Sequence, residues 1–406
     1  MSGPIWLSFE VDGLALTLTC LFSLITLFSL IYSLISIRRF GFKTEYYVIL
    51  LLLAASGISF LYARNLILLY ALWEINTFAI WRLVGFHRRD EDIEHAERTF
   101  LINFFAAVIM LVGLGLIYTQ SGTFDLTRMK GLSLPPASAY LILVGILAKS
   151  ATVPLHVWLP YAYESAPIPV AAMLASISEN LGLILFLRLF RQTFSLPENF
   201  YLTVMVIAAG SILIGGGTAL VTNRIRRILA YSTISQLGFI LIGFAAGGTY
   251  GIIGGLLYII GHSLSKPGIF YAVGIVEERT KAVELGGIGF GPVMPTLGPG
   301  FALLAGSVVG LPPFIGFFAK LYVIIGVLKV NLVLAALTVG GALFTLLYFL
   351  RLYNGIFKGK TTLEVSPSPV SGMIVLVLIL AVVTILAGIA VIIPNPWIEG
   401  VMKSWL

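Results

Sequence analysis

Five ionisable side chains lie near the middle of long apolar segments: Glu74, Lys149, Glu179, His262 and Lys320. A charge at the centre of a lipid bilayer costs about 3 kcal/mol on insertion scales, so such residues usually face a bundle interior or a water-filled path. Carboxylate, amine and imidazole groups can each take up and release a proton. The pattern therefore predicts an ion pathway within a membrane protein.

Glu74 has no basic residue close to it in sequence, because Arg82 and Arg64 are eight and ten residues away. That separation is more than about 10 Å of helical rise, which makes a local structural ion pair the weaker interpretation. Glu74 is instead predicted to carry a proton or to accept a lysine from another helix. Lys149 is the candidate, because it lies too deep to reach the membrane surface comfortably as a snorkelling anchor. Together the two residues would form a pair whose protonation can switch.

His262 and Lys266 are four residues apart in IIGHSLSKPGIF and therefore share one helix face. A histidine there can relay protons near neutral pH, whereas an isolated buried histidine is usually a hydrogen-bonded packing residue. Lys266 beside it favours the relay. His87 and His95 occur in the charged segment HRRDEDIEHAER and are expected to be solvated.

Glu179 and Asn180 fall in the middle of the apolar segment AAMLASISENLGLILFLRLF, and Lys320 follows a Pro-Pro pair. The four histidines are too scattered for a metal site, and the sequence contains no phosphate-binding loop, cysteine cluster or hydrolytic triad. We therefore expect no metal, cofactor or redox centre in this chain.

The composition places these residues in a membrane protein. Hydrophobic residues make up 59% of the chain and charged residues 11%, about half the usual share for a soluble protein. The mean hydropathy is +1.02. No polar stretch is long enough for a soluble domain, so residues 1–406 are predicted to form a single transmembrane domain. The net charge of +7 comes from short connections between apolar segments, which argues against nucleic-acid binding.

The apolar segments predict an all-α polytopic fold with about twelve transmembrane helices. Their expected ranges are 13–37, 46–63, 65–86, 98–120, 137–158, 168–190, 200–221, 227–247, 249–276, 297–328, 331–355 and 371–393.

Lysine and arginine concentrate in the connections that follow odd-numbered helices: Arg38, Arg39, Lys43, Arg88, Arg89, Arg98, Arg224, Arg226, Arg227, Arg279, Lys281, Lys358 and Lys360. Basic connections stay on the cytoplasmic side of a membrane. Both termini are therefore expected outside the cytoplasm, in a multi-pass protein of the cell's inner (cytoplasmic) membrane.

Two of the expected helices contain proline at depth. The fifth contains Pro154, and the tenth contains Pro312 and Pro313, so both should be broken, each with a lysine close to the break. The broken helix is the fourth of five in each of two groups, at about 46–190 and 200–355. Five is odd, so the groups would be inverted repeats, with residues 13–37 and 371–393 as peripheral helices.

Four sequence blocks carry a resemblance to a known family. KSATVPLHVWLPYAYESAPIPVAAMLA (149–175) resembles the signature of the antiporter-like subunits of respiratory complex I, membrane-bound hydrogenases and Mrp sodium/proton antiporters. RIRRILAYSTISQLG (224–238), HSLSKPGIFYAVG (262–274) and GLPPFIGFFAK (310–320) resemble three further blocks of that family, in the same order.

The resemblance implies that Glu74 and Lys149 are the family's glutamate–lysine pair. It also implies that His262 with Lys266 is the central relay and Lys320 the terminal lysine. The family usually has a further lysine where this chain has Asn180, with Glu179 beside it, so the link between Lys149 and His262 is expected to work differently.

FEVDGLALTL resembles the start of the family's third helix but begins at residue 9. The chain is therefore expected to be an N-terminally shortened member of the family.

The sequence thus predicts a membrane subunit that moves protons, or exchanges sodium for protons, in a complex related to complex I, to a membrane-bound hydrogenase or to an Mrp antiporter. Other membrane subunits and the lipid bilayer are its expected partners, and the energy would come from those subunits or from an ion gradient. Two alternatives remain. One is a stand-alone cation/proton transporter, and the other is a structural subunit in which Asn180 interrupts proton transfer.

Overall fold

The computed structural model describes residues 8–38, 41–361, 363–365 and 371–392. Within these ranges the chain is a bundle of helices, and ten helices are long and apolar enough to cross a membrane. The prediction of an all-α membrane protein is confirmed. Both chain termini, Arg39 and residue 393, which entered the predictions above, lie outside the described residues.

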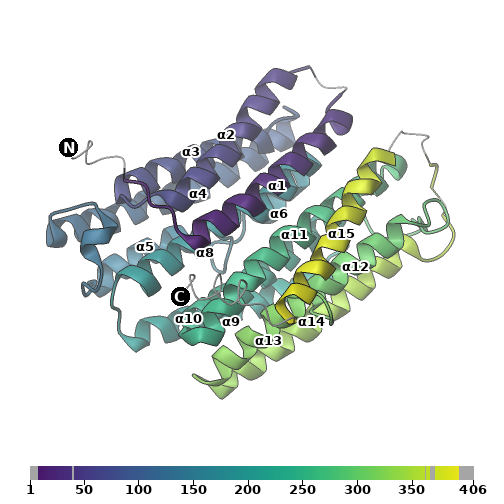
Figure 1. Cartoon of the computed structure of the whole chain (residues 1–406). Helices are drawn as coiled ribbons and strands as arrows, with labels where there is room; N and C mark the ends of the chain where they lie inside the picture. The colour runs from purple at the N-terminus through teal and green to yellow at the C-terminus, as the bar shows by residue number, and fades with distance from the viewer. Residues whose placement is uncertain (1–7, 39–40, 362, 366–370, 393–406) are drawn as a thin grey trace.

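The N-terminal part begins with helices that lie together at one side of the molecule (Figure 1). They are α1 (Gly13–Ser36), α2 (Lys43–Tyr62), α3 (Leu66–Val84) and α4 (Asp90–Ser121). A short 3₁₀ helix, η1 (Leu126–Met129), leads to α5 (Pro136–Lys149) and α6 (Leu159–Ser165).

The next span is continuous over residues 168–193 but changes its helical pitch. It consists of α7 (Ile168–Met173), the π-helical segment η2 (Leu174–Ser178), α8 (Glu179–Phe186) and the π-helical segment η3 (Leu187–Thr193). Such π segments often mark functional sites. Here they lie immediately before and after α8, whose first residue is Glu179.

The C-terminal part contains two long central helices and a group at the opposite side of the molecule (Figure 1). Its elements are α9 (Glu198–Val221), α10 (Ile225–Ala246), α11 (Gly248–Thr280), α12 (Leu297–Val309), α13 (Ile315–Leu328), α14 (Leu332–Phe357) and α15 (Ser371–Ile392).

Three of the spans form the centre of the bundle. In the apolar 18-residue segment of each span, all residues of the span over 168–193 and 94% of those of α10 and α11 are buried, against 33–50% in the other long helices. The central spans carry Glu179, His262 and Lys266. These residues therefore lie within protein and face neither lipid nor bulk water.

Two helices are interrupted where the prolines predict it. Residues 150–158, which include Pro154, separate α5 from α6, and residues 310–314, which include Pro312 and Pro313, separate α12 from α13. The connection after α5 is held by the indole of Trp158, which donates to the Ala148 carbonyl at 2.8 Å. Each break leaves helix ends, with their unpaired carbonyls, inside the bundle.

A fourth proline frees a carbonyl without breaking its helix. Pro267 lies inside α11 and has no N–H to donate to the carbonyl of Ser263, one turn earlier. The hydroxyl of Ser176 in η2 donates to that carbonyl instead, at 3.2 Å. The proline thus ties α11 to the π segment that precedes Glu179.

Helix α4 begins at Asp90, about two turns before the predicted start at residue 98. Three acidic residues in its first turn complement the positive end of the helix dipole, which explains the extension. The expectation that His95 is solvated is wrong. Its ring is buried on the extended helix, and Nδ1 lies 2.6 Å from the hydroxyl of Ser165.

The carboxylate of Asp12 holds together α1, the connection between α2 and α3, and η3. Asp12 accepts the Ala15 N–H at 2.7 Å, which caps α1, and its Oδ2 lies 2.5 Å from both Arg64 and Arg188. Burial alone would raise the pKa of Asp12, but the hydrogen bond and charge of Arg188, together with the Ala15 N–H and the charge of Arg64, lower it below its ordinary value. The ionised form therefore stabilises the fold.

We expect Asp12→Asn to keep the helix cap but to destabilise the folded subunit by about 2 kcal/mol, because two largely buried arginines lose their shared counter-charge. A lowered folded-state pKa means that this contribution is fully present above about pH 4 and is lost as the pH falls through the folded-state pKa. Thermal unfolding of the purified complex, followed at several pH values, measures the difference.

The matched control is Glu94→Gln, at an exposed pair with Arg98, which should change stability by less than about 0.5 kcal/mol. Equal melting of wild type and Asp12→Asn at pH 7 would contradict this account.

Candidate ion pathway

Lys149 is the last residue of α5 and points its ammonium at the backbone of α3. Nζ donates to the Thr77 hydroxyl at 2.6 Å and to the Trp73 carbonyl at 3.3 Å, and it lies 4.9 Å from the centre of the Trp73 ring. The side chain is 1% exposed. A carbonyl, a hydroxyl and an aromatic face therefore replace the water that a lysine would otherwise bind.

Glu74 follows Trp73 on α3 and is half-buried. Its Oε1 is buried without a hydrogen-bond partner among the described residues. The charges of Glu74 and Lys149 act on each other, but no described carboxylate lies within the 4.0 Å of an ion pair from Nζ. The two residues are therefore neighbours without direct contact.

The local alternative for Glu74 is wrong, because both nearby arginines have other partners. Arg82 pairs with Glu45, and Arg64 pairs with Glu10 and Asp12.

Glu179 is completely buried and does point into the bundle. The Tyr163 hydroxyl donates to its Oε1 at 2.7 Å, whereas Oε2 has no partner among the described residues. Tyr163 Oη also lies 3.5 Å from the hydroxyl of Thr233 on α10. Glu179 is thus connected through one tyrosine to the central helix of the C-terminal half.

Lys266 extends from α11 to the same part of α10. Its Nζ donates at 3.0 Å to the Leu229 carbonyl and at 3.0 Å to the Ser232 hydroxyl. The Thr233 hydroxyl donates to the same Leu229 carbonyl, at 3.0 Å. The structure therefore links Glu179 to Lys266 by the contacts Tyr163, Thr233 and the carbonyl of Leu229.

His262 stands apart from this link. Neither ring nitrogen has a hydrogen-bond partner among the described residues, although the ring is only 2% exposed and faces the backbone of Ala175. Asn180 is close by: its Nδ2 donates to the Ser176 carbonyl at 2.9 Å and to the Ser263 hydroxyl at 3.1 Å. Its Oδ1 has no described partner. The amide thus bonds to α11 beside the histidine.

Lys320 lies on α13, after the break in the tenth span. Its Nζ donates at 3.0 Å to the carbonyl of Val309, the last residue of α12, and lies 4.9 Å from the centre of the Phe239 ring. The broken helix supplies the acceptor, because a carbonyl in the last turn of a helix has no partner within the helix.

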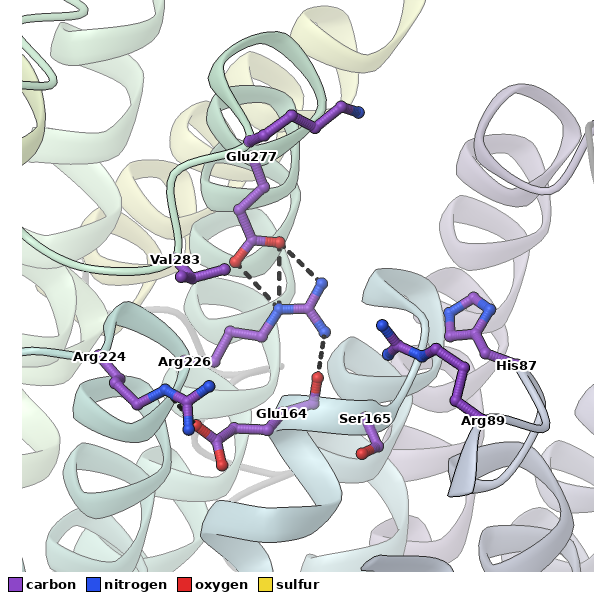
Figure 2. A pocket seen from close by; sticks show the side chains of 9 residues that line it. His87, Arg89, Glu164, Ser165, Arg224, Arg226, Glu277 and Val283 are labelled. Carbon is purple, nitrogen blue, oxygen red and sulfur yellow. Dashed lines mark hydrogen bonds and ion pairs between the residues drawn. The ribbon is translucent and has the colours of Figure 1, made fainter. Parts of the chain in front are cut away.

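A polar pocket of about 250 Å³ opens at the end of the bundle where α3 joins α4 and α6 joins α7 (Figure 2). Arg226 lines it, with Nη2 2.7 Å from Glu277 and Nη1 donating to the carbonyls of Tyr163, Glu164 and Ala166. The pocket therefore lies directly over the segment that carries Tyr163.

His87 lines this pocket, in the connection between α3 and α4. Burial lowers the pKa of His87, the charge of Asp92 opposes that shift, and the charges of Arg89 and Arg226 add to it. At neutral pH His87 is therefore uncharged beside the arginines. Among the described residues no group of histidine, cysteine, aspartate and glutamate is arranged to hold a metal ion.

The sequence predictions missed the neutral partners of the buried charges: Thr77, Tyr163, Ser232 and Thr233. The sequence did contain a signal for Ser232 and Thr233. Leu229, Ser232 and Thr233 are spaced at three and four residues in RIRRILAYSTISQLG, so they share the helix face that meets Lys266. No spacing rule links Thr77 or Tyr163 to a lysine or acid on another helix.

Comparison with known proteins gives the class of this chain. The family described as "NADH:quinone oxidoreductase/Mrp antiporter, TM" matches residues 63–345. The NADH-quinone oxidoreductase subunit M of Rickettsia prowazekii is 30% identical over 360 residues, which cover 87% of this chain and 73% of that protein. The chain belongs to this family and is an antiporter-like membrane subunit.

Two solved structures share the fold. A chain of the Mrp complex from Dietzia sp. DQ12-45-1b superimposes with a TM-score of 0.87 at 23% identity and covers 98% of this chain and 83% of its own length. A chain of respiratory complex I from Thermus thermophilus superimposes with a TM-score of 0.81 at 23% identity, covering 96% and 86%.

Proposed function

We propose that this chain translocates protons across a membrane as one subunit of a larger respiratory or antiporter complex. One observation carries the proposal: Lys149, Lys266 and Lys320 are buried, yet each binds carbonyls or hydroxyls and none binds a carboxylate directly among the described residues. A lysine locked in an ion pair keeps its proton, whereas a lysine held by neutral groups can release it when a nearby charge changes.

The link between Glu179 and Lys266 supports a continuous route through the centre. Tyr163 and Thr233 hold Glu179 beside the Leu229 carbonyl that Lys266 binds, at a distance from His262. That carbonyl accepts hydrogen bonds from both sides and passes no proton itself, so the proposed transfer between Lys266 and Glu179 uses water. The Lys266 ammonium gives one proton to water and becomes a neutral amine, and the Glu179 carboxylate takes one proton from water and becomes a neutral acid; the reverse transfer restores both groups. Glu179 thereby replaces the lysine that the family usually carries at the position of Asn180.

Unpartnered polar atoms near this link support the presence of water in the route. Glu179 Oε2, Asn180 Oδ1, the Ser178 hydroxyl and both nitrogens of His262 are buried without a described partner. Buried polar atoms are usually satisfied by ordered water, and water chains carry protons. The polar pocket over Tyr163 is the proposed entrance to the route from the cytoplasmic side.

Glu74 and Lys149 form the proposed start of the proton route. Because their charges act on each other without direct contact, a charge that approaches the exposed edge of α3 in a partner subunit changes the proton affinity of Lys149. Coupling to partners is part of the proposal, because the sequence offers no redox centre or nucleotide site.

The proposed architecture is that of two inverted five-helix repeats, about 46–190 and 200–355, flanked by peripheral helices 13–37 and 371–393. The interruptions between α5 and α6 and between α12 and α13, in equivalent positions, support it. The basic connections support the proposed topology, with both termini outside the cytoplasm and the subunit in the cytoplasmic membrane. The proposed partners are subunits of complex I, hydrogenase or Mrp type. Exchange of sodium for protons belongs to the same proposal.

A proton-inactive structural subunit is the second candidate function. Asn180 favours it, because an amide bonded to Ser176 and Ser263 stands where the family has a titratable lysine.

The test of the proposed function is Lys149→Ala in the reconstituted complex. We expect driven proton uptake to fall at least about tenfold, because α5 carries no other amine and no carboxylate. Uptake is measured with a pH-sensitive dye in proteoliposomes. Lys358→Ala, an exposed lysine, is the matched control and should leave uptake unchanged. Unchanged uptake in assembled Lys149→Ala would favour the structural subunit.

A second pair of variants tests the role of Glu179. We expect Glu179→Gln to lower driven uptake about tenfold, because an amide keeps the Tyr163 contact but neither binds nor releases a proton. Asn180→Lys in the Glu179→Gln background should restore part of it by supplying the usual lysine. Full uptake in Glu179→Gln alone would remove this residue from the route.

A further inference from the structure

Beyond Lys266, hydrogen bonds continue to four residues that the route described above does not use. Ser232, which accepts from Lys266, donates to the hydroxyl of Tyr348 on α14 at 3.0 Å. Gln236, one turn further along α10, donates from Nε2 to the same Tyr348 hydroxyl at 2.9 Å. Its Oε1 accepts the hydroxyl of Tyr258 on α11 at 2.5 Å. All four residues are buried; Gln236 is 0% exposed.

This group extends from Lys266 toward Lys320. The ring of Tyr258 stacks on Phe239, with ring centres 5.6 Å apart, and the ammonium of Lys320 lies 4.9 Å from the centre of the Phe239 ring. Phe239 therefore contacts both the ring of Tyr258 and the ammonium of the terminal lysine.

The direction of the hydrogen bonds shows where proton transfer stops. Lys266 donates to Ser232 and Ser232 donates to Tyr348, so the donors point from Lys266 toward Tyr348. Tyr348 also accepts from Gln236, so the donors meet there from both sides. A carboxamide neither takes up nor releases a proton at neutral pH, whichever way it is turned.

We propose that Gln236 is an insulating residue, whose amide joins the two tyrosine hydroxyls but passes no proton between them, so that Lys266 and Lys320 are protonated separately. This inference rests on the proposed proton translocation. A route with lysines at both ends needs such a barrier, because an unbroken chain of hydroxyls would let protons flow back along the gradient. Gln236 acts through Tyr348 and Tyr258 and is therefore a positioning residue.

The experiment measures passive proton leak and driven uptake in proteoliposomes that contain the whole complex. Gln236→Glu keeps the shape of the side chain but can accept a proton on one carboxylate oxygen and release it from the other. We expect its passive leak to rise about tenfold over wild type and to increase further as the pH is raised through the range in which the new acid ionises. Gln236→Leu passes no proton and should show wild-type leak.

Two further variants separate insulation from simple disruption. Gln236→Glu combined with Tyr258→Phe keeps the ring on Phe239 but removes the next hydroxyl, so the leak should return to the wild-type level. Asn103→Asp converts another buried amide, which bonds to the Thr99 carbonyl on α4, into an acid away from this group and should cause no leak.

Gln236→His is the second variant, for use if Gln236→Glu does not assemble. It also introduces a proton carrier, but an imidazole can remain uncharged. It should leak as well. Wild-type leak in whichever of the two variants assembles, or leak that persists with Tyr258→Phe, would overturn the insulating role. These results are distinct from failure of the proposed function, which Lys149→Ala reports through driven uptake alone.

Discussion

The structure depends on how three amines are accommodated in the interior of a membrane protein. Lys149, Lys266 and Lys320 each donate to a backbone carbonyl and lie 4.9–6.0 Å from the centre of an aromatic ring. Dipoles and ring faces offset part of the cost of burying an ammonium but do not hold its proton as a carboxylate would. The amines are thereby kept inside the protein and able to titrate.

Free carbonyls are scarce in continuous helices, and irregular features of the fold provide two that the buried groups use. The end of α12 exposes the Val309 carbonyl to Lys320, and Pro267 releases the Ser263 carbonyl, which binds the π segment before Glu179. At α8, a Cβ on Gly182 would lie 2.7 Å from the Ile146 carbonyl, so the glycine lets α8 approach the end of α5. Breaks, π segments and close packing therefore position the buried charges.

Much of the fold was predictable because the physical signals are local. Runs of apolar residues located the spans, and Pro154, Pro312 and Pro313 located both interruptions. The start of α4 was missed because its first two turns are charged, and apolar length was the criterion for a helix. The deep charges were also predictable, since an ionisable residue in an apolar run is conspicuous by itself. Their neutral partners were not, because contacts such as that of Tyr163 with Glu179 depend on packing between distant segments.

The central claim is that buried lysines bound by neutral groups carry the transported protons. Lys266 gives its most direct test, because it lies between the two halves of the bundle. The measurement is the number of protons taken up per driving turnover in proteoliposomes that contain the assembled complex with Lys266→Ala. Lys329→Ala, an exposed lysine 4.4 Å from the Tyr250 ring centre, serves as the matched control. The account predicts that Lys266→Ala removes this subunit's share of the protons while Lys329→Ala retains it. An unchanged number of protons in assembled Lys266→Ala would contradict the account.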